Sequence, residues 1–477
     1  MKLKKIIIEN FRSIKSIEIK IDEINNSFTY CLLGINESGK SSILKAIDFY
    51  DSKNIKYPID FFDNTKSVYV EFEYEIDNPT LEAIYVDLKK DYDLSDEMIK
   101  KLKFNNLIIR REHFIDETNK IVNIFQAENI FDEYTFKNEK IIIKESDSDP
   151  DFNFNQFINE NVNDIFWTYS HNVILWKSTP EYLILESIDL NKFAEKPKEV
   201  SVPLLNCFKL IGINEAQIKE SVSKLNTPLA LHNLQNKLSD EVTEHIKRVW
   251  PEHPISIKFQ IDNQKITFLV EDENVKYKVK TTDQRSDGFK QFISFLLTLS
   301  IENANDELEE TILLIDEPEV HLHPPAQINL LSELIKISSN GKNNAVFFAT
   351  HSNYLIDKNN LNRCFKVNKI DNEYTIIKRL EEKITTYSEV NFEVFDICTN
   401  DYHNELYGYI EDIDKAKLNS LPKNKKWKNE KSGKTDDVSL VTYIRHSIHH
   451  PENLSNKKFT EKELKTSIEK LRKLKYS

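Results

Sequence analysis

The chain has 477 residues, of which 39% are hydrophobic and 30% charged, and its formal net charge is −13. It is long enough for about three domains, and its acidic balance argues against a uniformly basic nucleic-acid-binding protein. No apolar run reaches the ~18 residues of a membrane span, and Glu9 and Arg12 interrupt the lysine-rich start, unlike a signal peptide. Four cysteines lie far apart without metal-ligand spacing, so we expect reduced thiols, a cytoplasmic location and no membrane partner.

The charge is uneven along the chain. Residues 401–477 contain 17 Lys and Arg against 12 Asp and Glu, whereas the preceding residues are strongly acidic. A basic segment on an acidic body indicates either a region with its own partner or a lysine-rich solvated surface.

The first ~130 residues predict a mixed sheet with one major helix. Strands are expected at 3–8, 15–21, 29–33, 68–76 and 107–110, and a helix at 40–50. Residues 145–165 are rich in Asn, Asp and Phe without a clear period, which predicts a loop or insertion.

A phosphate-binding loop follows the third of these strands. Residues 34–41 read Gly-Ile-Asn-Glu-Ser-Gly-Lys-Ser and fit the pattern G-x-x-x-x-G-K-[ST] between a strand and a helix. Gly34 and Gly39 let backbone N–H groups surround phosphate oxygens, and the helix N-terminus adds its positive dipole end. Lys40 is expected to reach the β- and γ-phosphates, and the Ser41 hydroxyl is expected to bind Mg²⁺.

The middle of the chain predicts helices over 214–250 and a hairpin of strands 255–261 and 265–270. A Ser286-x-Gly288 turn then precedes a helical pattern, and a helix N-terminus of this kind suits an anion.

Two carboxylates end the next buried strand. Four apolar residues, 312–315, run into Asp316 and Glu317, and Pro318 then stops the strand. A helix over 327–338 leads to a second buried strand, 345–349, which is followed by His351. Because open α/β sheets bind ligands at the carboxyl ends of their strands, we expect these groups to lie near the phosphate loop.

The order of these four motifs resembles that of an ABC-type ATPase head. The Asn-Phe-Arg-Ser start at residues 10–13 and the Asp-Glu-Pro-Glu run at 316–319 are similar to the group that contains the overcoming-lysogenization-defect ATPases and the SMC-like repair ATPases. The resemblance covers roughly residues 1–375. It implies an α/β fold, with mixed and parallel sheet and flanking helices, and ATP and Mg²⁺ as cofactors.

The resemblance also implies a role for each matched residue. ATP would be held by Gly34, Asn36, Gly39, Lys40, Ser41 and Ser42. Asp316 would join Ser41 on the magnesium ion, Glu317 would polarise the attacking water, and His351 would sense the γ-phosphate. Ser286 and Gly288 would contact the γ-phosphate bound to a second copy, so that two heads enclose two ATP molecules. No residue is assigned as the magnesium-contacting Gln of the family: Gln126 and Gln156 are both candidates, and Arg12 is either near the nucleotide or structural.

Two family features are missing from the sequence. Residues 352–400 lack the clustered acids of the nuclease domain that overcoming-lysogenization-defect relatives carry, and no heptad pattern lasts long enough for the coiled coil of SMC-type ATPases.

The C-terminal ~90 residues predict a small helical module. Helices are expected at 402–418, 438–448 and 461–474, the last with a capping box of Thr460 and Glu463. Residues 419–437 predict a polar loop that exposes Trp427 among lysines, where a single nucleic-acid strand could bind by charge and stacking.

Arg445 and His450 at the end of the middle helix resemble the Arg-x4-His motif of HEPN ribonucleases. In that family the Arg stabilises phosphate charge and the His is the acid–base group. A histidine-rich helix end that only packs or caps is the alternative.

We therefore divide the chain into an ATPase lobe with the phosphate loop (1–180), a helical segment (181–254), a second ATPase lobe (255–380) and a basic helical module (385–477). The predicted function is an ATP-hydrolysing regulator that dimerises, or forms a higher homo-oligomer, and controls a separately encoded nuclease or toxin in bacterial anti-phage defence. A self-contained ATPase–ribonuclease and an SMC-like DNA repair ATPase are the alternatives, and nucleic acid is an expected partner.

Overall fold

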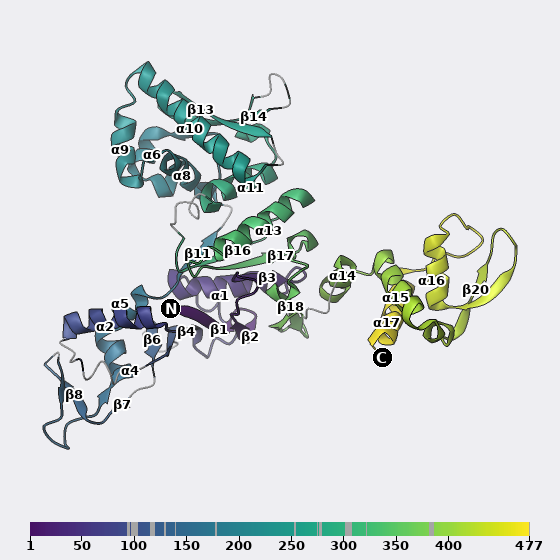
Figure 1. Cartoon of the computed structure of the whole chain (residues 1–477), viewed down its shortest axis with the longest axis horizontal. Coiled ribbons are helices and arrows are strands. Elements are labelled where there is room, and N and C mark those ends of the chain that lie inside the picture. Colours follow the sequence, from purple (N-terminus) through teal and green to yellow (C-terminus); the bar gives the residue numbers. More distant parts are fainter. Residues whose placement is uncertain are drawn as a thin grey trace. The chain divides into compact units, whose positions relative to one another are not determined.

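The computed structural model describes residues 1–92, 96, 104–114, 120–127, 130–138, 140–176, 179–251, 254–273, 275, 279–300, 308–320, 322–380 and 386–476. Two compact units divide the chain, one of residues 1–357 and 363–379 and the other of 358–362 and 380–477 (Figure 1). Among the described residues, no helix is both long and apolar enough to cross a membrane. The four-part division made from the sequence stays a prediction, and its last boundary falls at residues 381–385, outside the described part.

A six-stranded sheet carries the phosphate loop in the first unit. Its strands, in order across the sheet, are β11 (Asn172–Trp176), β16 (Thr311–Asp316), β17 (Ala345–Thr350), β3 (Thr29–Leu33), β18 (Cys364–Ile370) and β19 (Tyr374–Arg379). All neighbours are parallel except β18 and β19. Every residue of β3 and β17 is buried, which explains their continuous apolar runs. Helices α1 (Lys40–Ser52) and α13 (Pro324–Ser338) pack on this sheet, so the predicted α/β fold is confirmed.

A second, antiparallel sheet holds the other N-terminal strands. Its order is β2 (Ile14–Lys20), β1 (Lys2–Phe11), β4 (Val68–Glu75), β5 (Asn106–His113) and β6 (Ile121–Gln126). The expectation of one mixed sheet in the first ~130 residues is therefore wrong, because β3 pairs with β17 and β18 from the far end of the unit. A further helix, α2 (Asn78–Tyr92), also lies in this region. Apolar residues of both sheets share one hydrophobic core.

Residues 145–165 do not form the expected loop. They contain α4 (Phe154–Phe157), a π-helical turn (Ile158–Val162) and the start of α5 (Asn163–Thr168). The phenylalanines at 154, 157 and 166 are buried, and the side chain of Asn159 hydrogen-bonds both backbone groups of Phe125 on β6. Tertiary packing of these aromatic rings therefore overrides the polar composition.

The remainder of the first unit is a helical segment beside a smaller antiparallel sheet. The predicted helices over 214–250 and the predicted hairpin are confirmed, as α9, α10, β13 and β14. The elements are α6 (Leu190–Glu195), α7 (Pro197–Val200), α8 (Val202–Leu210), α9 (Glu215–Ser223), α10 (Pro228–Val249), α11 (Asp287–Phe295), β12 (Ser187–Asp189), β13 (Ile255–Asp262), β14 (Lys265–Asp272) and β15 (Val279–Thr281). Two short strand pairs lie elsewhere in the unit, β7 (Ile130–Phe131) with β10 (Phe152–Asn153) and β8 (Tyr134–Lys137) with β9 (Lys140–Ile143).

The second unit is a helix bundle with a β-hairpin. It contains α14 (Tyr387–Phe395), α15 (Asn400–Asn419), β20 (Lys423–Lys428), β21 (Thr435–Ser439), α16 (Leu440–His449) and α17 (Glu461–Tyr476). The capping box of α17 is confirmed, since Thr460 and Glu463 exchange hydrogen bonds. Leu406 and Ile410 of α15 enter the core of this unit, whereas Tyr409 and Ile413 are exposed.

The expected polar loop at 419–437 is wrong. Its lysine-rich half forms β20, which pairs with β21, and Trp427 points into the unit with only 6% of its surface exposed. Alternation explains the difference, because a strand turns alternate side chains to opposite faces. Thus the lysines on either side of Trp427 remain exposed while the indole ring is buried.

Candidate functional site: a phosphate loop facing an acidic strand end

The phosphate loop joins the end of β3 to the start of α1. Gly39 caps the helix with φ 108°, a conformation that side chains rarely tolerate. A Cβ on Gly39 would lie 2.1 Å from Thr375 Oγ1, and one on Gly34 would lie 2.4 Å from the Val367 carbonyl oxygen. Both glycines are therefore required by the close approach of β18 and β19, besides leaving the loop backbone open to a ligand.

Lys40 lies folded against its own loop. Its ammonium group donates to the carbonyl oxygens of Gly34 (2.9 Å) and Ile35 (3.0 Å) and lies 3.0 Å from His351 Nε2. Burial lowers the pKa of the Lys40 ammonium, and the carboxylates of Glu317 and Asp316 partly oppose that shift. The charge is thus held close to the loop and available to a phosphate group.

Glu317 and His351 meet at the carboxyl ends of two adjacent parallel strands. His351 Nε2 lies 3.0 Å from Glu317 Oε1, and the Glu317 N–H donates to the Ala349 carbonyl oxygen (2.9 Å). The Nε2 atom accepts from Lys40 when it carries no proton and donates to Glu317 when it carries one. The three side chains therefore form a connected polar group that couples the phosphate loop to the end of β16.

Asp316 supplies an oxygen atom that suits a metal ion. Its Oδ1 is buried and has no hydrogen-bond partner among the described residues, and the predicted second ligand, Ser41, lines the cavity described below. Mg²⁺ takes oxygen ligands and commonly uses only one or two side chains together with substrate phosphates. Asp316 is not among the residues that line that cavity, and the oxygen chemistry of the two side chains suits a nucleotide-bound magnesium ion.

Two residues to which the sequence assigns no role, Glu319 and Thr375, also build the site. The backbone N–H of His351 donates to Glu319 Oε1 (2.8 Å), which fixes the start of the His351 loop. Thr375 donates to the Ser38 carbonyl oxygen (3.1 Å) and contacts the Ser13 hydroxyl (2.8 Å), so β19 holds the phosphate loop against the turn after β1. Glu319 belongs to the acidic run already noted, whereas nothing local in the sequence indicates Thr375.

A cavity of about 910 Å³ lies over the loop. It is lined by Arg12, Ser13, Asn36, Glu37, Ser38, Gly39, Lys40, Ser41, Ser42, Glu317, His351 and Lys369. Arg12 also contacts Asp60 through Nε (2.6 Å), which agrees with the structural role considered for it, and its role near a nucleotide stays a prediction. Gln126 lines a different cavity, and Gln156 hydrogen-bonds Glu160, so the structure brings neither glutamine here.

Ser286 and Gly288 lie apart from this cavity. Ser286 caps α11 by accepting from the Phe289 N–H (3.3 Å), and both residues line a separate cavity of about 300 Å³. His323, the cap of α13, lines the same cavity. The turn at the start of α11 is thus formed, its anion binding stays a prediction, and within one copy it is not part of the phosphate-loop cavity.

Arg445 and His450 do not line a common cavity. The Arg445 guanidinium lies over the ring of Tyr407 (5.3 Å), whereas His450 lines a cavity on the second unit and pairs with Glu452 (3.4 Å). Their predicted ribonuclease role stays a prediction without a shared site to support it.

The chain is similar to proteins of two phages and of Methanocaldococcus jannaschii. It is 25% identical over 391 residues to the Old nuclease of Escherichia phage P2, which covers 80% of this chain and 62% of that protein. An uncharacterized protein of Methanocaldococcus jannaschii is 30% identical over 146 residues (29% and 36%), and protein ea59 of Escherichia phage lambda is 26% identical over 196 residues (39% and 33%). The chain thus spans between a third and three fifths of the length of these relatives.

Two solved structures were also similar. One is an SMC head bound to the C-terminal winged-helix domain of ScpA (TM-score 0.42, 15% identity, covering 80% of this chain and 98% of that one). The other is the SMC head domain from Thermotoga maritima (TM-score 0.39, 13% identity, covering 80% and 100%).

A family model matches residues 30–357, which include the phosphate loop, the acidic end of β16 and His351. The chain therefore belongs to the family described as AAA domain, putative AbiEii toxin, type IV toxin–antitoxin system.

Proposed function

We propose that this protein binds ATP with Mg²⁺ in the 910 Å³ cavity and hydrolyses it there. The observation that carries the proposal is the position of His351 Nε2 beside the phosphate loop. This atom lies 3.0 Å from Lys40 Nζ and 3.0 Å from Glu317 Oε1. A cation, an imidazole and a carboxylate converge where a γ-phosphate and its attacking water would lie.

Each group has a task that its chemistry suits. The loop N–H groups and the α1 N-terminus bind phosphate oxygens, and Lys40 exchanges its loop carbonyls for the β- and γ-phosphates. Ser41 and Asp316 would hold Mg²⁺, which would neutralise developing phosphate charge when bound. Glu317 orients the water for in-line attack and accepts its proton, while His351 donates to the γ-phosphate.

Hydrolysis would require two copies of the chain. Ser286 and Gly288 line a separate cavity of the same copy, and we assign their turn as a second anion-binding site. A symmetric dimer in which this turn of one copy closes on the ATP of the other would complete two equal sites. Catalysis then depends on closure, because phosphoryl transfer rests on positioning and charge stabilisation.

The biological role we propose is regulation of a separately encoded nuclease or toxin in anti-phage defence, in the cytoplasm. Support comes from the family description, which names a putative toxin of a type IV toxin–antitoxin system, and from the similarity to phage proteins. Residues 352–400 lack the clustered acids that a nuclease of the overcoming-lysogenization-defect type would use after the head. We assign the effector to another gene product.

Glu317→Gln tests the proposal directly. The variant should bind ATP as the wild type does, because the amide keeps the shape of the carboxylate. Hydrolysis should fall by roughly 10²–10⁴-fold, because the group that accepts the proton is lost. Glu373→Gln, an exposed position outside the cavity, is the matched control and should keep full turnover.

The same variant reports on association. Unhydrolysed ATP should hold two copies together, so size-exclusion chromatography with ATP and Mg²⁺ should show more dimer for Glu317→Gln than for the wild type. Full turnover by Glu317→Gln would refute the catalytic assignment, and unchanged association would refute ATP-dependent pairing.

A further inference from the structure

The second unit has a cavity of its own, about 370 Å³ in volume. Its walls come from the end of β20, the end of α16 and the segment that precedes α17. The lining residues are Trp427, Ser447, His450, Pro451, Asn453, Leu454, Asn456, Lys457, Lys458 and Phe459. All of them lie outside residues 30–357, so the family match says nothing about this cavity.

Aromatic rings form one side of this cavity. The Trp427 ring is fixed by an edge contact with Tyr443 (5.6 Å between ring centres) and lies 6.4 Å from the exposed ring of His450. Phe459, partly buried, lies on the same lining. A wall of this kind suits a flat, partly apolar group such as a nucleobase, which has a π-face whatever its sequence.

The walls are held in place by side-chain hydrogen bonds to the backbone. Asn456 accepts from the Lys428 N–H (2.8 Å) and donates to the Lys428 carbonyl oxygen (2.9 Å), and Asn453 donates to the same oxygen (2.9 Å). The Tyr443 hydroxyl donates to the Lys457 carbonyl oxygen. Residues 453–457 are therefore fastened to β20 and α16, and a ligand would meet a preformed site rather than order a loop.

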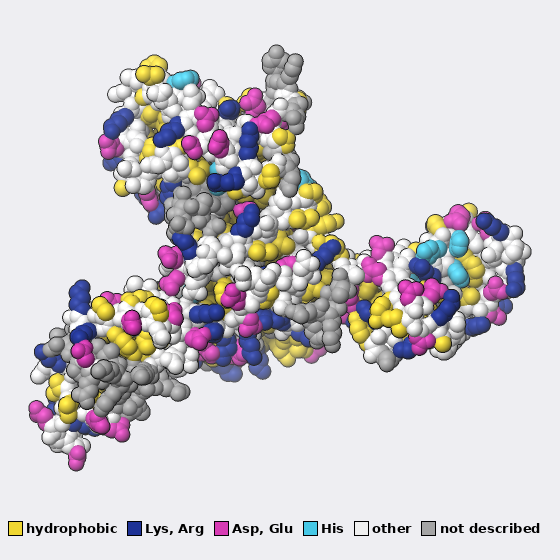
Figure 2. Space-filling view, viewed as in Figure 1, with side chains coloured by type: hydrophobic (Ala, Val, Ile, Leu, Met, Phe, Trp, Pro, Cys, Tyr) yellow, Lys and Arg dark blue, Asp and Glu magenta, His cyan; other side chains and the backbone are white. Residues whose placement is uncertain are grey.

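The edge of the cavity is positively charged. Lys457 and Lys458 line it, are exposed, and form no ion pair with any described residue. Residues 421–458 contain nine Lys and Arg against four Asp and Glu, so this stretch accounts for the basic character of the C-terminal region. Figure 2 shows histidine side chains gathered on this unit with Lys or Arg side chains nearby.

We propose that this cavity binds an unpaired nucleotide, with its base against Trp427 and His450 and its phosphate groups on Lys457 and Lys458. A base in a duplex is already stacked and cannot enter, so the site selects single-stranded nucleic acid or a free nucleotide. This assigns His450 to ligand binding, which its position in the cavity supports, and it does not depend on the proposed ATPase function.

The experiment uses the full chain carrying Lys40→Ala, so that mononucleotides do not occupy the phosphate loop. A fluorescein-labelled 12-nucleotide single-stranded RNA, the same sequence as DNA, and its duplex are titrated by fluorescence anisotropy at several salt concentrations. AMP and UMP are then tested as competitors. We expect at least one single strand to bind more tightly than the duplex. Efficient competition by AMP or UMP would identify a free nucleotide as the ligand. Weak competition would identify the single-stranded nucleic acid as the ligand.

Three variants locate the binding. Lys457→Ala with Lys458→Ala should reduce the slope of log affinity against log salt by about 1.4, because each lost phosphate contact on a single strand contributes about 0.7. His450→Ala should weaken binding about tenfold through loss of stacking, and His450→Phe should restore it. Lys470→Ala with Lys473→Ala removes the same charge from α17 outside the cavity and should leave the slope unchanged.

Circular dichroism and thermal unfolding of each variant distinguish a binding defect from misfolding, and His450 and both lysines are exposed, so folding should be retained. The proposal is overturned if no single strand and no mononucleotide binds, if the duplex binds as tightly as the single strands, or if both sets of lysine variants lower the slope equally.

Discussion

At the scale of single residues, three residues that line the phosphate-loop cavity have unusual backbone conformations. Arg12 (φ 50°), Glu37 (φ 63°) and Glu317 (φ 49°) all line it, and each adopts the left-handed conformation without being glycine. Such residues cost of order 1–3 kcal/mol each and persist where the surrounding structure holds them. Hydrogen bonds supply that support, from the Arg12 N–H to Asp60 and from the Glu317 N–H to Ala349. Strain at these positions agrees with a site built for function.

Lys40→Ala should abolish ATP binding. The substitution removes the only ammonium group that the described residues place against the loop carbonyls of Gly34 and Ile35, and with it the charge that bridges the β- and γ-phosphates. Lys45→Ala, an exposed position on the same helix, is the control. Binding of a fluorescent ATP analogue measures both, and wild-type affinity in Lys40→Ala would refute the assignment of the loop.

At the scale of elements, a local sequence pattern predicts a segment correctly where a continuous apolar run shows that the segment is buried. The range 29–33 predicted from its apolar run is that of β3, and the two acidic residues after 312–315 do lie at a strand end beside the phosphate loop. The fixed spacing of the two glycines before Lys40 predicts the geometry of the loop without information about distant contacts. These features of the candidate site could therefore be predicted from the sequence.

Features that depend on distant partners could not be predicted. The membership of β3 in a sheet with β17 and β18 follows from pairings more than 300 residues apart along the chain. Thr375 reaches the phosphate loop only because β19 returns beside β18. The lysines around Trp427 predict a polar loop. Only the pairing of β20 with β21 turns the ring inward.

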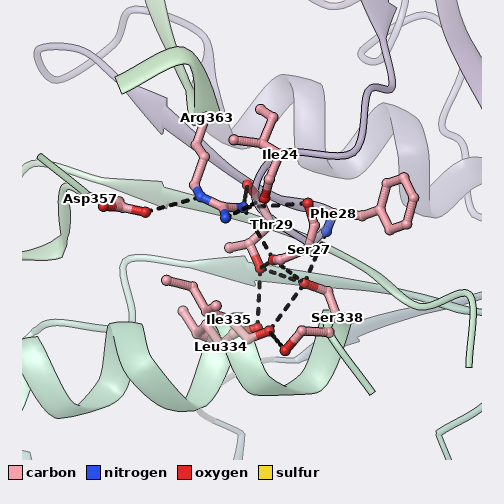
Figure 3. Close-up of polar contacts among 10 residues, drawn as sticks. Ile24, Ser27, Phe28, Thr29, Leu334, Ile335, Ser338, Asp357 and Arg363 are labelled. Atoms are coloured by element: carbon pink, nitrogen blue, oxygen red, sulfur yellow. Dashed lines mark hydrogen bonds and ion pairs between the residues drawn. The ribbon is translucent and has the colours of Figure 1, made fainter. Parts of the chain in front are cut away.

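A buried polar network holds the start of β3, at the opposite end of the strand from the phosphate loop (Figure 3). Arg363, only 2% exposed, donates to the carbonyl oxygens of Ile24, Ser27 and Thr29 and pairs with Asp357 (3.0 Å). Hydroxyl contacts of Ser338 with Ser27 (2.6 Å) and Thr29 (2.7 Å) connect the same strand to the end of α13.

Arg363→Met should destabilise the first unit by about 3–5 kcal/mol, because it leaves the Asp357 carboxylate and several backbone oxygens without their donor. Arg379→Met breaks an ion pair with Asp22 in which both side chains are more exposed, so it should cost at most about 1 kcal/mol. Guanidinium-induced unfolding followed by tryptophan fluorescence measures both, and three of the four tryptophans lie in this unit. Equal midpoints for the two variants would show that the network does not stabilise the fold.

At the scale of the whole molecule, the chain combines two units with different chemistry. The family match ends at residue 357, and the first unit contains the complete set of phosphate-loop residues. The second unit has its own hydrophobic core and its own cavity. This division agrees with an ATPase head and a separate binding module, as proposed above. Substitutions in one unit should therefore leave the activity proposed for the other unit unchanged.

The dimer model predicts complementation between two inactive variants. Ser286→Arg should place a bulky cation where the γ-phosphate of the other copy would bind, so it should bind ATP and yet not hydrolyse it. Lys40→Ala is inactive for the opposite reason, because it retains Ser286 but cannot hold its own nucleotide. Mixed dimers pair an intact phosphate loop with an intact Ser286 turn at one of their two sites, so an equimolar mixture should regain roughly a quarter of wild-type turnover if copies exchange freely.

Ser286→Thr keeps the hydroxyl that caps α11 and serves as the control, with turnover close to wild type. Steady-state ATPase assays of each variant alone and of the mixture measure the effect, after pre-incubation without nucleotide to allow exchange. Wild-type turnover by Ser286→Arg alone would show that this residue contacts no nucleotide. If the mixture is no more active than its components, the two copies do not share their sites, and hydrolysis would have to be completed by groups of a single chain.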